Sequence, residues 1–419
     1  MASPKAVEGG KRGSRGLKAH HTTTRQTRLP TRWRLLGWIC AGHSLSHFWT
    51  LALPPLFPAL AAHFGVTYLQ LGLLVGAYSL TFGLFQLPSG YLVDRFGAKP
   101  VLVGGLLLNG SALALYGLAP GYPALLGLAL LAGIGKSVFH PADYAILSAA
   151  FSRERSGRPY SLHTFSGFAG SAAAPVTVAG LHQLLGWQMA LAIAGLVGVG
   201  LAFLLVWRLQ VPDLGLPSPG GRPFFLLSRP LVLMFIFYVF AAMVTSGLQS
   251  FLPATLNRLY GISLSSAGAV LTTYLVALAG GVLLGGAVAD HVRHHARVVS
   301  SLFVGGMLLM LLVAVAHPPI WLLFPIFAAG GALHGIIMPS RDKLVRGAAP
   351  EGLAGKSFGF VSTGMSLGSV VAPSVLGMVL DANRPDLVFW AISVFMLAAA
   401  STTLAYRQNP GRQTTVQGK

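Results

Sequence analysis

The sequence has little charge, very little acid and a single cysteine. Of its 419 residues only 9% are charged and 54% are hydrophobic, whereas about 25% of the residues in an ordinary soluble domain are charged. A water-soluble protein of this length needs far more charge to cover its surface, so the composition excludes a soluble enzyme. Because Cys40 is the one cysteine, an intrachain disulfide and a Cys-rich metal site are excluded as well.

Long apolar segments take up most of the chain. A helix needs about 20 mostly apolar residues to cross a bilayer, and the short alternating segments of a membrane β-barrel are missing. The pattern predicts an all-α membrane protein with twelve transmembrane helices. They are expected at residues 35–62, 68–93, 100–119, 122–150, 160–182, 187–207, 230–256, 264–288, 298–316, 320–340, 355–380 and 387–406.

The excess of basic over acidic residues follows this topology. The 29 Lys and Arg residues outnumber the 10 Asp and Glu residues, and all but three of the basic ones lie in the tails or in alternate loops. Such asymmetry places both termini in the cytoplasm. The net charge of +19 is therefore expected to face anionic lipid headgroups, and no nucleic-acid partner is predicted. Residues 1–33 are predicted to be a basic, disordered cytoplasmic tail, with an organellar transit peptide as the weaker alternative.

The two halves of the chain are related. A shift of 196 residues places Gly72 on Gly268 and Asp94 on Asp290, and a shift of 198 places Pro141 on Pro339. The repeat predicts two pseudo-symmetric six-helix bundles at 34–207 and 230–407. A cytoplasmic linker at 208–229 joins them, and a cytoplasmic tail follows at 408–419. Parallel repeats around a midplane site are an architecture of secondary transporters.

The segment between the second and third spans carries a motif. Gly90, Asp94, Arg95, Gly97 and Lys99 resemble the loop signature of the major facilitator superfamily, from which only the residue before Lys99 departs. With the twelve spans and the repeat, the resemblance covers about residues 34–407. It implies the major facilitator fold and a secondary active transporter that works by alternating access.

The resemblance also implies a gate. Gly90 is expected to let two helices approach closely, and Asp94 to accept hydrogen bonds from the N-terminus of the eleventh span near Gly355. Asp290 in the second copy is expected to serve the fifth span in the same way. Such contacts would close the cytoplasmic side and break when the protein opens inward.

Two further segments narrow the resemblance. Ser46-His47-Phe48 and Phe139-His140-Pro141-Ala142-Asp143-Tyr144 are similar to bacterial facilitators grouped with the fosmidomycin-resistance exporters. This similarity implies proton-coupled export of small anionic compounds across a bacterial inner membrane.

Charged residues interrupt the fourth span. Lys136, His140 and Asp143 fall within an arc of about 60° and span about 10 Å of a helix. Ionisable groups in a membrane segment are costly and therefore indicate function, and His140 is suited to relay a proton between the other two. The alternatives are a packing network and an ion pair between Asp143 and Arg95.

Two other pairs of residues join this candidate pathway. His43 and His47 share one face of the first span, where we expect a cavity or proton role, with core packing or metal binding as alternatives. His334 and Arg341 occupy the repeat positions of Lys136 and Asp143, although Arg341 could instead lie at the membrane interface. A site so rich in basic groups favours an anionic substrate.

Together these features predict a proton-coupled transporter of a small organic anion. Its expected partners are the substrate, protons and the lipid bilayer. It is expected to be monomeric, with no cofactor, resident metal or enzyme activity, because neither a catalytic signature nor a nucleotide-binding loop occurs. The alternatives are a multidrug efflux proton antiporter, which would need an acidic cavity, and a non-transporting membrane sensor. Proton-driven uptake of a carboxylate fits the same residues, so the direction of transport stays open.

Overall fold

The computed structural model describes residues 2–3, 29–151, 157–211, 228–350 and 354–406. Most of the predicted 1–33 tail, most of the 208–229 linker and the 408–419 tail lie outside these residues. The regular secondary structure of the described residues is entirely helical, and they form no strand. The helices of the first half are α1 (Leu29–Thr50), η1 (Pro54–Leu56), α2 (Phe57–Phe64), α3 (Tyr68–Phe96), α4 (Ala98–Leu115), η2 (Tyr116–Leu118), α5 (Tyr122–Ser137), α6 (Phe139–Ala150), α7 (Gly157–Leu185) and α8 (Trp187–Arg208).

The second half has six long helices. They are α9 (Arg229–Tyr260), α10 (Leu264–His291), α11 (His295–Ala316), α12 (Ile320–Ala348), α13 (Ala354–Asp381) and α14 (Asp386–Ala405). Within the described residues, ten helical segments are long and apolar enough to cross a membrane, and α1 and α7 pack beside them. The predicted all-helical membrane fold is confirmed.

Three of the predicted spans are not single helices, and in one of them, 100–119, η2 follows directly after the end of α4. Residues 35–62 divide into α1, η1 and α2, because Pro54, Pro55 and Pro58 cannot donate main-chain hydrogen bonds at the junction. Residues 122–150 divide at Val138 into α5 and α6. There Pro141 lacks the N–H that would bond the Ser137 carbonyl, so the expectation of one continuous fourth helix is wrong.

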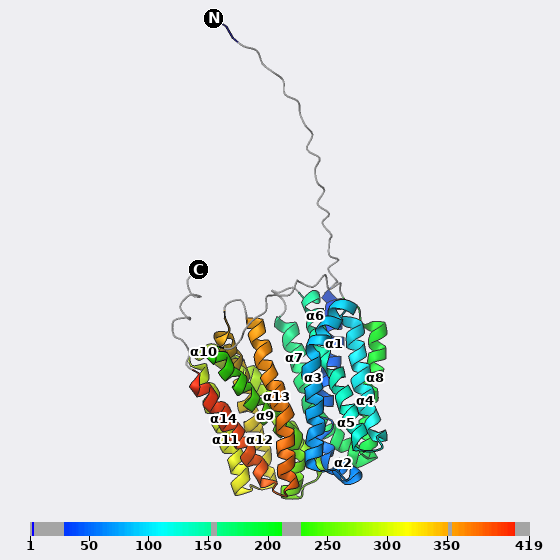
Figure 1. Ribbon diagram of the computed structural model, residues 1–419, viewed down its shortest axis with the longest axis vertical. Coiled ribbons are helices and arrows are strands. Elements are labelled where there is room, and N and C mark those ends of the chain that lie inside the picture. The colour runs from blue at the N-terminus through cyan, green and yellow to red at the C-terminus, as the bar shows by residue number, and fades with distance from the viewer. Residues whose placement is uncertain (1, 4–28, 152–156, 212–227, 351–353, 407–419) are drawn as a thin grey trace.

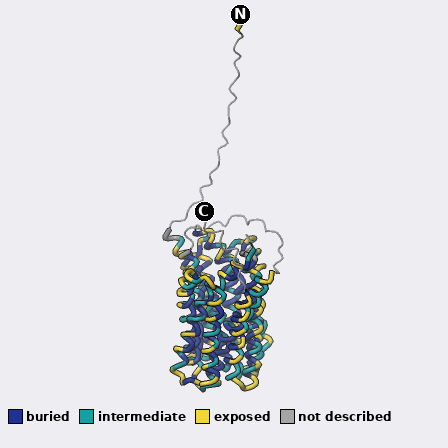
Figure 2. The backbone as a smooth tube through the Cα atoms, turned by 90° about the vertical axis from the view of Figure 1, so that its left-hand side faces the viewer, coloured by how far each residue is buried: buried dark blue, intermediate teal, exposed yellow. Residues whose placement is uncertain are grey.

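The helices pair in the same way in each half (Figure 1). In the first half α1 packs on α7, α3 on α5 and α4 on α8, and in the second half α9 packs on α13, α10 on α12 and α11 on α14. Figure 1 shows the start of α1 and the end of α14, the described residues nearest the two termini, at one end of the bundles and α2 at the other. Many large apolar residues are exposed on the outside of the bundles. Figure 2 shows where exposed and buried residues lie along the backbone.

Glycine contacts repeat along with the helix pairs. A Cβ added at Gly133 would lie 2.3 Å from the Tyr78 carbonyl oxygen, and one added at Gly331 would lie 2.1 Å from the Tyr274 carbonyl oxygen. These positions are related by the same 196 and 198 shifts found in the sequence. Close backbone approach through glycine is typical of helices packed in membranes, so the internal repeat is structural as well as sequential.

Two pairs of long helices join the halves, α3 with α13 and α7 with α10, and the short helix η1 also contacts α9 and α10. A Cβ at Gly72 would lie 2.3 Å from the Pro373 carbonyl oxygen, and one at Gly268 would lie 3.0 Å from that of Pro175. The hydroxyl of Thr272 also donates to the Ala172 carbonyl oxygen at 2.8 Å. The two halves therefore touch through backbone, across both pseudo-symmetric contacts.

Candidate functional site

Lys136 is buried at the end of α5, where its ammonium group turns toward α1. Its Nζ donates to the carbonyl oxygen of Ser46 at 3.0 Å and lies 3.4 Å from the Ser46 hydroxyl. The same group lies 5.9 Å from the centre of the Phe82 ring. The side chain is only 4% exposed, so Lys136 points into the protein and not toward lipid.

Asp143, on α6, is fully buried between two histidines. Its Oδ2 lies 3.0 Å from Nε2 of His163, on α7, and 3.2 Å from Nδ1 of His43, on α1. The two imidazole rings lie with their centres 3.7 Å apart. Three helices therefore meet at one carboxylate, and the alternative ion pair between Asp143 and Arg95 is wrong, since Arg95 is exposed.

His47 and His140 form the less buried edge of this cluster. The ring of His140 lies 5.4 Å from that of His43 and 6.3 Å from that of His47. His47 Nδ1 is 3.4 Å from the hydroxyl of Ser171, whereas His47 Nε2 and His140 Nδ1 are buried without a hydrogen-bond partner. Among the described residues His140 bonds to neither Lys136 nor Asp143, so the direct relay expected between them is not formed here.

His163, on α7, is the residue of this cluster to which the sequence analysis assigned no role. A Cβ at Gly170 would lie 2.0 Å from the Ser44 carbonyl oxygen, and one at Gly167 would lie 2.9 Å from His43 Nε2. These glycines let α7 lie directly on α1. His163 lies on the same helix, one turn before Gly167. Their spacing was the available signal, but it shows close packing without naming the partner helix.

The cluster contains one group with the donor set of a transition-metal site. Nitrogen atoms of His43 and His163 and a carboxylate oxygen of Asp143 lie within 4.8 Å of one another. Imidazole and carboxylate are common zinc ligands. In the same three groups Asp143 is hydrogen-bonded to His163 and lies within ion-pair distance of His43, whose Nδ1 has no hydrogen-bond partner among the described residues, so the geometry suits a proton as well.

The second half places His334 at the corresponding position. Nδ1 of this buried residue lies 2.7 Å from the Tyr274 hydroxyl, and Nε2 lies 3.3 Å from the Thr245 hydroxyl. No acid contacts His334 in the described residues. The two halves thus share a polar centre at the repeat position, but only the first half buries a carboxylate in it.

Arg341 lies about two helical turns after His334 on α12. Its Nε donates to Asp342 Oδ1 at 3.0 Å, and its guanidinium lies 4.8 Å from the centre of the Tyr238 ring. The Tyr238 hydroxyl donates to the same carboxylate at 3.1 Å. Arg341 therefore belongs to a small network of its own and does not contact the cluster around Asp143.

The motif residues lie at the end of the bundles near the termini. Asp94 is exposed, and its carboxylate accepts no hydrogen bond from the described residues. A Cβ at Gly90 would meet nothing within 4 Å, so the close approach expected there is absent in this conformation. Lys99 donates to the Val206 carbonyl oxygen at 2.8 Å, and Gly97 adopts a φ of 85° between α3 and α4.

Within the part of the chain that the structure describes, Asp290 does not contact α7, contrary to expectation. Its carboxylate accepts a bond of 2.9 Å from Lys343 on α12, and the same ammonium group donates to the Ala289 carbonyl oxygen at 2.6 Å. The reason is that α12 continues to Ala348, beyond the predicted end at residue 340, and brings Lys343 beside the end of α10.

At the opposite end, a carboxylate joins the two halves. Asp381, the last residue of α13, accepts bonds of 2.7 Å and 2.8 Å from the main-chain N–H groups of Tyr68 and Leu69. These groups open α3 and have no partner within the helix, while the Thr67 side chain caps the next N–H. We call Asp381 with the start of α3 the carboxylate clamp.

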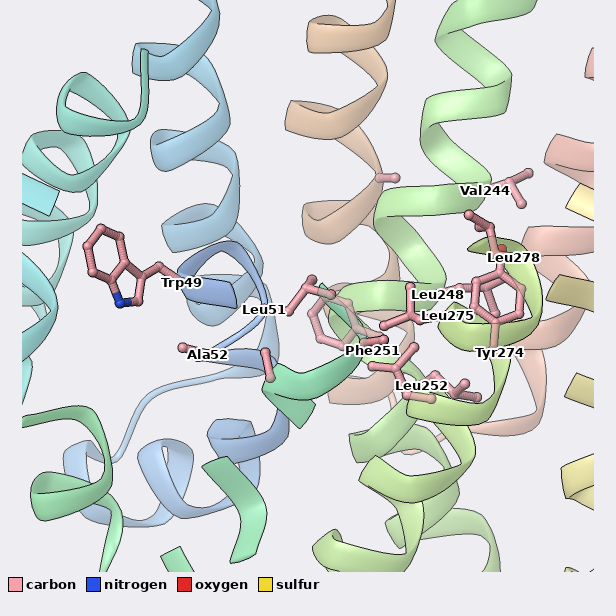
Figure 3. Packing of buried hydrophobic residues seen from close by; sticks show 14 of the residues in the cluster. Trp49, Leu51, Ala52, Val244, Leu248, Phe251, Leu252, Tyr274, Leu275 and Leu278 are labelled. Carbon is pink, nitrogen blue, oxygen red and sulfur yellow. The ribbon is translucent and has the colours of Figure 1, made fainter. Parts of the chain in front are cut away.

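An arginine and an apolar layer extend the carboxylate clamp. Arg258, on α9, donates to the Leu380 carbonyl oxygen at 2.6 Å and lies 4.4 Å from the centre of the Tyr68 ring. Phe251 packs against Phe57 and Tyr68. Figure 3 shows Leu51 from the first half beside Phe251 in this layer. This end of the molecule is thus sealed by charge and by apolar packing together.

A buried polar cluster inside two repeated bundles, closed at one end, is the arrangement of a multi-pass membrane transporter. The sequence profile of the Major Facilitator Superfamily matches residues 39–254 and again residues 234–419. The chain belongs to this superfamily, and it is a membrane transporter of small molecules and not an enzyme.

Individual relatives agree with this assignment. The chain is 27% identical to the fosmidomycin resistance protein of Escherichia coli, over 87% of this chain and 90% of the relative. It is 24% identical to a probable sulfoacetate transporter, SauU, of Cupriavidus necator, over 84% of this chain and 88% of the relative. Among solved structures, it resembles a bacterial homologue of the human lysosomal transporter Spinster, in an inward-facing, occupied conformation. That match has a TM-score of 0.81 and 17% identity, and covers 92% of this chain and all of the other.

Proposed function

We propose that this protein is a proton-coupled secondary transporter that moves a small organic anion by alternating access. The observation that carries the proposal is the cluster in which Asp143 lies between two imidazoles, hydrogen-bonded to His163 and 3.2 Å from His43, while Lys136 is buried nearby. Charged groups in the membrane interior cost several kcal/mol. Helix packing does not require such groups, so their presence together supports a functional role. The proposed proton and substrate pathway keeps the residues predicted from the sequence: His43, His47, Lys136, His140, Asp143, His334 and Arg341.

The cluster around Asp143 is suited to bind and release a proton. Imidazole is the side chain that titrates nearest neutral pH, and a proton bound between the carboxylate and either His43 or His163 converts a lone buried charge into an ion pair. Such a change alters the contacts among α1, α6 and α7. Proton binding is thereby coupled to the arrangement of helices that must move.

The basic groups favour an anionic substrate. The Lys136 ammonium has three donors, and two of them are directed at the oxygens of Ser46, which leaves one for a ligand. Arg341 supplies a second cation in the other half. The named cargo of one relative, sulfoacetate, is a small organic anion, and this chemistry supports the same class here.

The two ends of the molecule support alternating access. The end away from the termini is held by the carboxylate clamp, whereas at the other end Asp94 and Gly90 make no contact with the described residues of the second half. Since the distribution of Lys and Arg assigns the termini to the cytoplasm, we take this state as inward-facing. Opening to the other side then requires the carboxylate clamp to break.

The test is flux into proteoliposomes under an imposed pH gradient. A panel of sulfonates, phosphonates and carboxylates is offered, and a pH-sensitive dye reports proton movement. We expect anion flux with proton movement in the wild type, its loss in Lys136→Met, and partial recovery in Lys136→Arg, which restores the charge. Preferential flux of lipophilic cations would instead indicate a drug antiporter, and no flux under any gradient would favour a sensor.

A matched pair on one helix tests the proton site. His163→Ala removes a partner of Asp143, whereas His182→Ala changes a histidine further along α7. We expect His163→Ala to abolish substrate-dependent proton movement and His182→Ala to preserve it. Equal proton movement in both variants would refute the assignment of the proton to this cluster.

A further inference from the structure

A polar cleft lies outside the polar cluster, between the start of α1 and the end of α8. It has a volume of about 210 Å³ and is lined by Arg34, Leu35, Trp38, Trp207, Arg208 and Gln210. The cleft is at the end of the bundles that carries the termini, and it belongs to the first half alone. It is therefore separate from the cluster around Asp143.

Two guanidinium groups line this cleft, and no acid is among its described lining residues. Arg34 and Arg208 are both exposed, and neither makes an ion pair or hydrogen bond among the described residues. The main-chain oxygen of Val206, near the end of α8, already accepts a hydrogen bond from Lys99. Arg208 is therefore not needed to bond this carbonyl oxygen. Arginine pairs are suited to bind phosphate through several parallel N–H donors.

The same cleft continues into an apolar surface. Trp207 is 83% exposed, and Phe203 and Leu196 on the same helix are 59% and 58% exposed. These residues fall on one stripe of α8 with Gly200, where a Cβ would meet nothing within 4 Å. The stripe is an exposed apolar strip of α8 that begins beside the two arginines.

Tryptophan places this junction at the edge of the bilayer. Indole rings concentrate where the hydrocarbon core meets the headgroups, and both Trp38 and Trp207 line the cleft. The arginines then lie at headgroup depth and the α8 stripe at acyl-chain depth. A ligand that fits both must carry a phosphate at one end and an apolar chain at the other.

We propose that this cleft binds an anionic phospholipid, with the phosphate between Arg34 and Arg208 and an acyl chain along the α8 stripe. The indoles flank the glycerol region, and Gln210 can donate to a headgroup hydroxyl. Basic pockets at the ends of membrane helices are a recognised mode of lipid headgroup binding. The proposal does not depend on the transported substrate, since no residue of the polar cluster takes part.

The experiment is titration of the purified full-length protein in detergent with phosphatidylglycerol, followed by native mass spectrometry and thermal unfolding. Phosphatidylcholine tests the need for net negative charge, and inorganic phosphate tests the need for the acyl chain. We expect phosphatidylglycerol to bind at a concentration at least tenfold lower than phosphatidylcholine and to raise the melting temperature. Inorganic phosphate should do neither.

The variants keep the test falsifiable. Arg34→Gln with Arg208→Gln should lose the preference for phosphatidylglycerol, whereas Arg293→Gln with Arg297→Gln, which removes the same charge from the other half, should retain it. Circular dichroism checks that both double variants are folded. Equal lipid preference in the two double variants would overturn the proposal, and so would full stabilisation by inorganic phosphate, which would indicate a site for a soluble anion.

Discussion

The carboxylate clamp makes a quantitative prediction about conformational balance. Replacing Asp381 with Ala removes two charge-assisted bonds to the start of α3, of 2.7 Å and 2.8 Å. Hydrogen bonds to charged groups contribute about 1.5–3 kcal/mol each, but Asp381 is exposed to water. We therefore take about 1 kcal/mol for each bond. A loss of about 2 kcal/mol changes the balance between the sealed and open states about 30-fold.

This change can be measured as a distance between the two halves at that end. Spin labels are attached to cysteines placed at the exposed residues Ala62, on α2, and Ala382, after α13, in a background where Cys40 is replaced by Ser. Asp381→Ala should add a longer-distance population that the parent lacks. If the sealed state is about 99% populated in the parent, the open state should rise to roughly a quarter of the molecules.

A neighbouring acid provides the control. Asp386 lies at the same end but pairs with Arg384 within the second half, so Asp386→Asn removes a charge without breaking a contact between the halves. An unchanged distance distribution in Asp381→Ala would refute the reasoning. A shift of equal size in Asp386→Asn would refute it as well, because the effect would then reflect net charge alone.

Three further predictions concern packing and the motif. Gly72→Ala adds a methyl group where the Pro373 carbonyl oxygen stands 2.3 Å away; overpacking costs about 1–3 kcal/mol, so spin-label distances should show the sealed state depopulated. Trp49→Phe loses the 3.0 Å hydrogen bond from the indole to the Ala194 carbonyl oxygen. It should lower the melting temperature, and a denaturant titration should show a free energy of unfolding that is lower by about 1–3 kcal/mol. Asp94→Ala should abolish transport in the liposome assay with an unchanged melting temperature, and wild-type rates would argue against a gate at this residue.

The sequence predicted the spans well, but not the breaks within them. Hydropathy locates the segments because the bilayer demands apolar length, and it gives no measure of where a helix bends. The prolines at 54, 55 and 141 carried that information, since each lacks a donor. Helix ends were also placed too early, as in α12, because a helix continues past the point where its side chains turn polar. That error hid the pairing of Asp290 with Lys343.

The polar cluster was predicted in part. Lys136, Asp143 and His43 are conspicuous as ionisable residues in apolar surroundings, and the structure brings Asp143 and His43 together. His163 could not be assigned, because its role depends on which helix lies against Gly167 and Gly170. Asp381 was missed for a different reason: an acid at the end of a span resembles an ordinary loop residue until the partner helix is known.

The carboxylate clamp has one property with a genetic consequence. Asp381 binds main-chain amide groups, which every residue type except proline supplies, so no side-chain change at Tyr68 or Leu69 can restore a bond that Asp381 has lost. Second-site revertants of an Asp381 variant should therefore not restore an acid–base pair at the start of α3. They should arise at positions that weaken the competing open state, and selection for regained growth on a transported compound would map that state residue by residue.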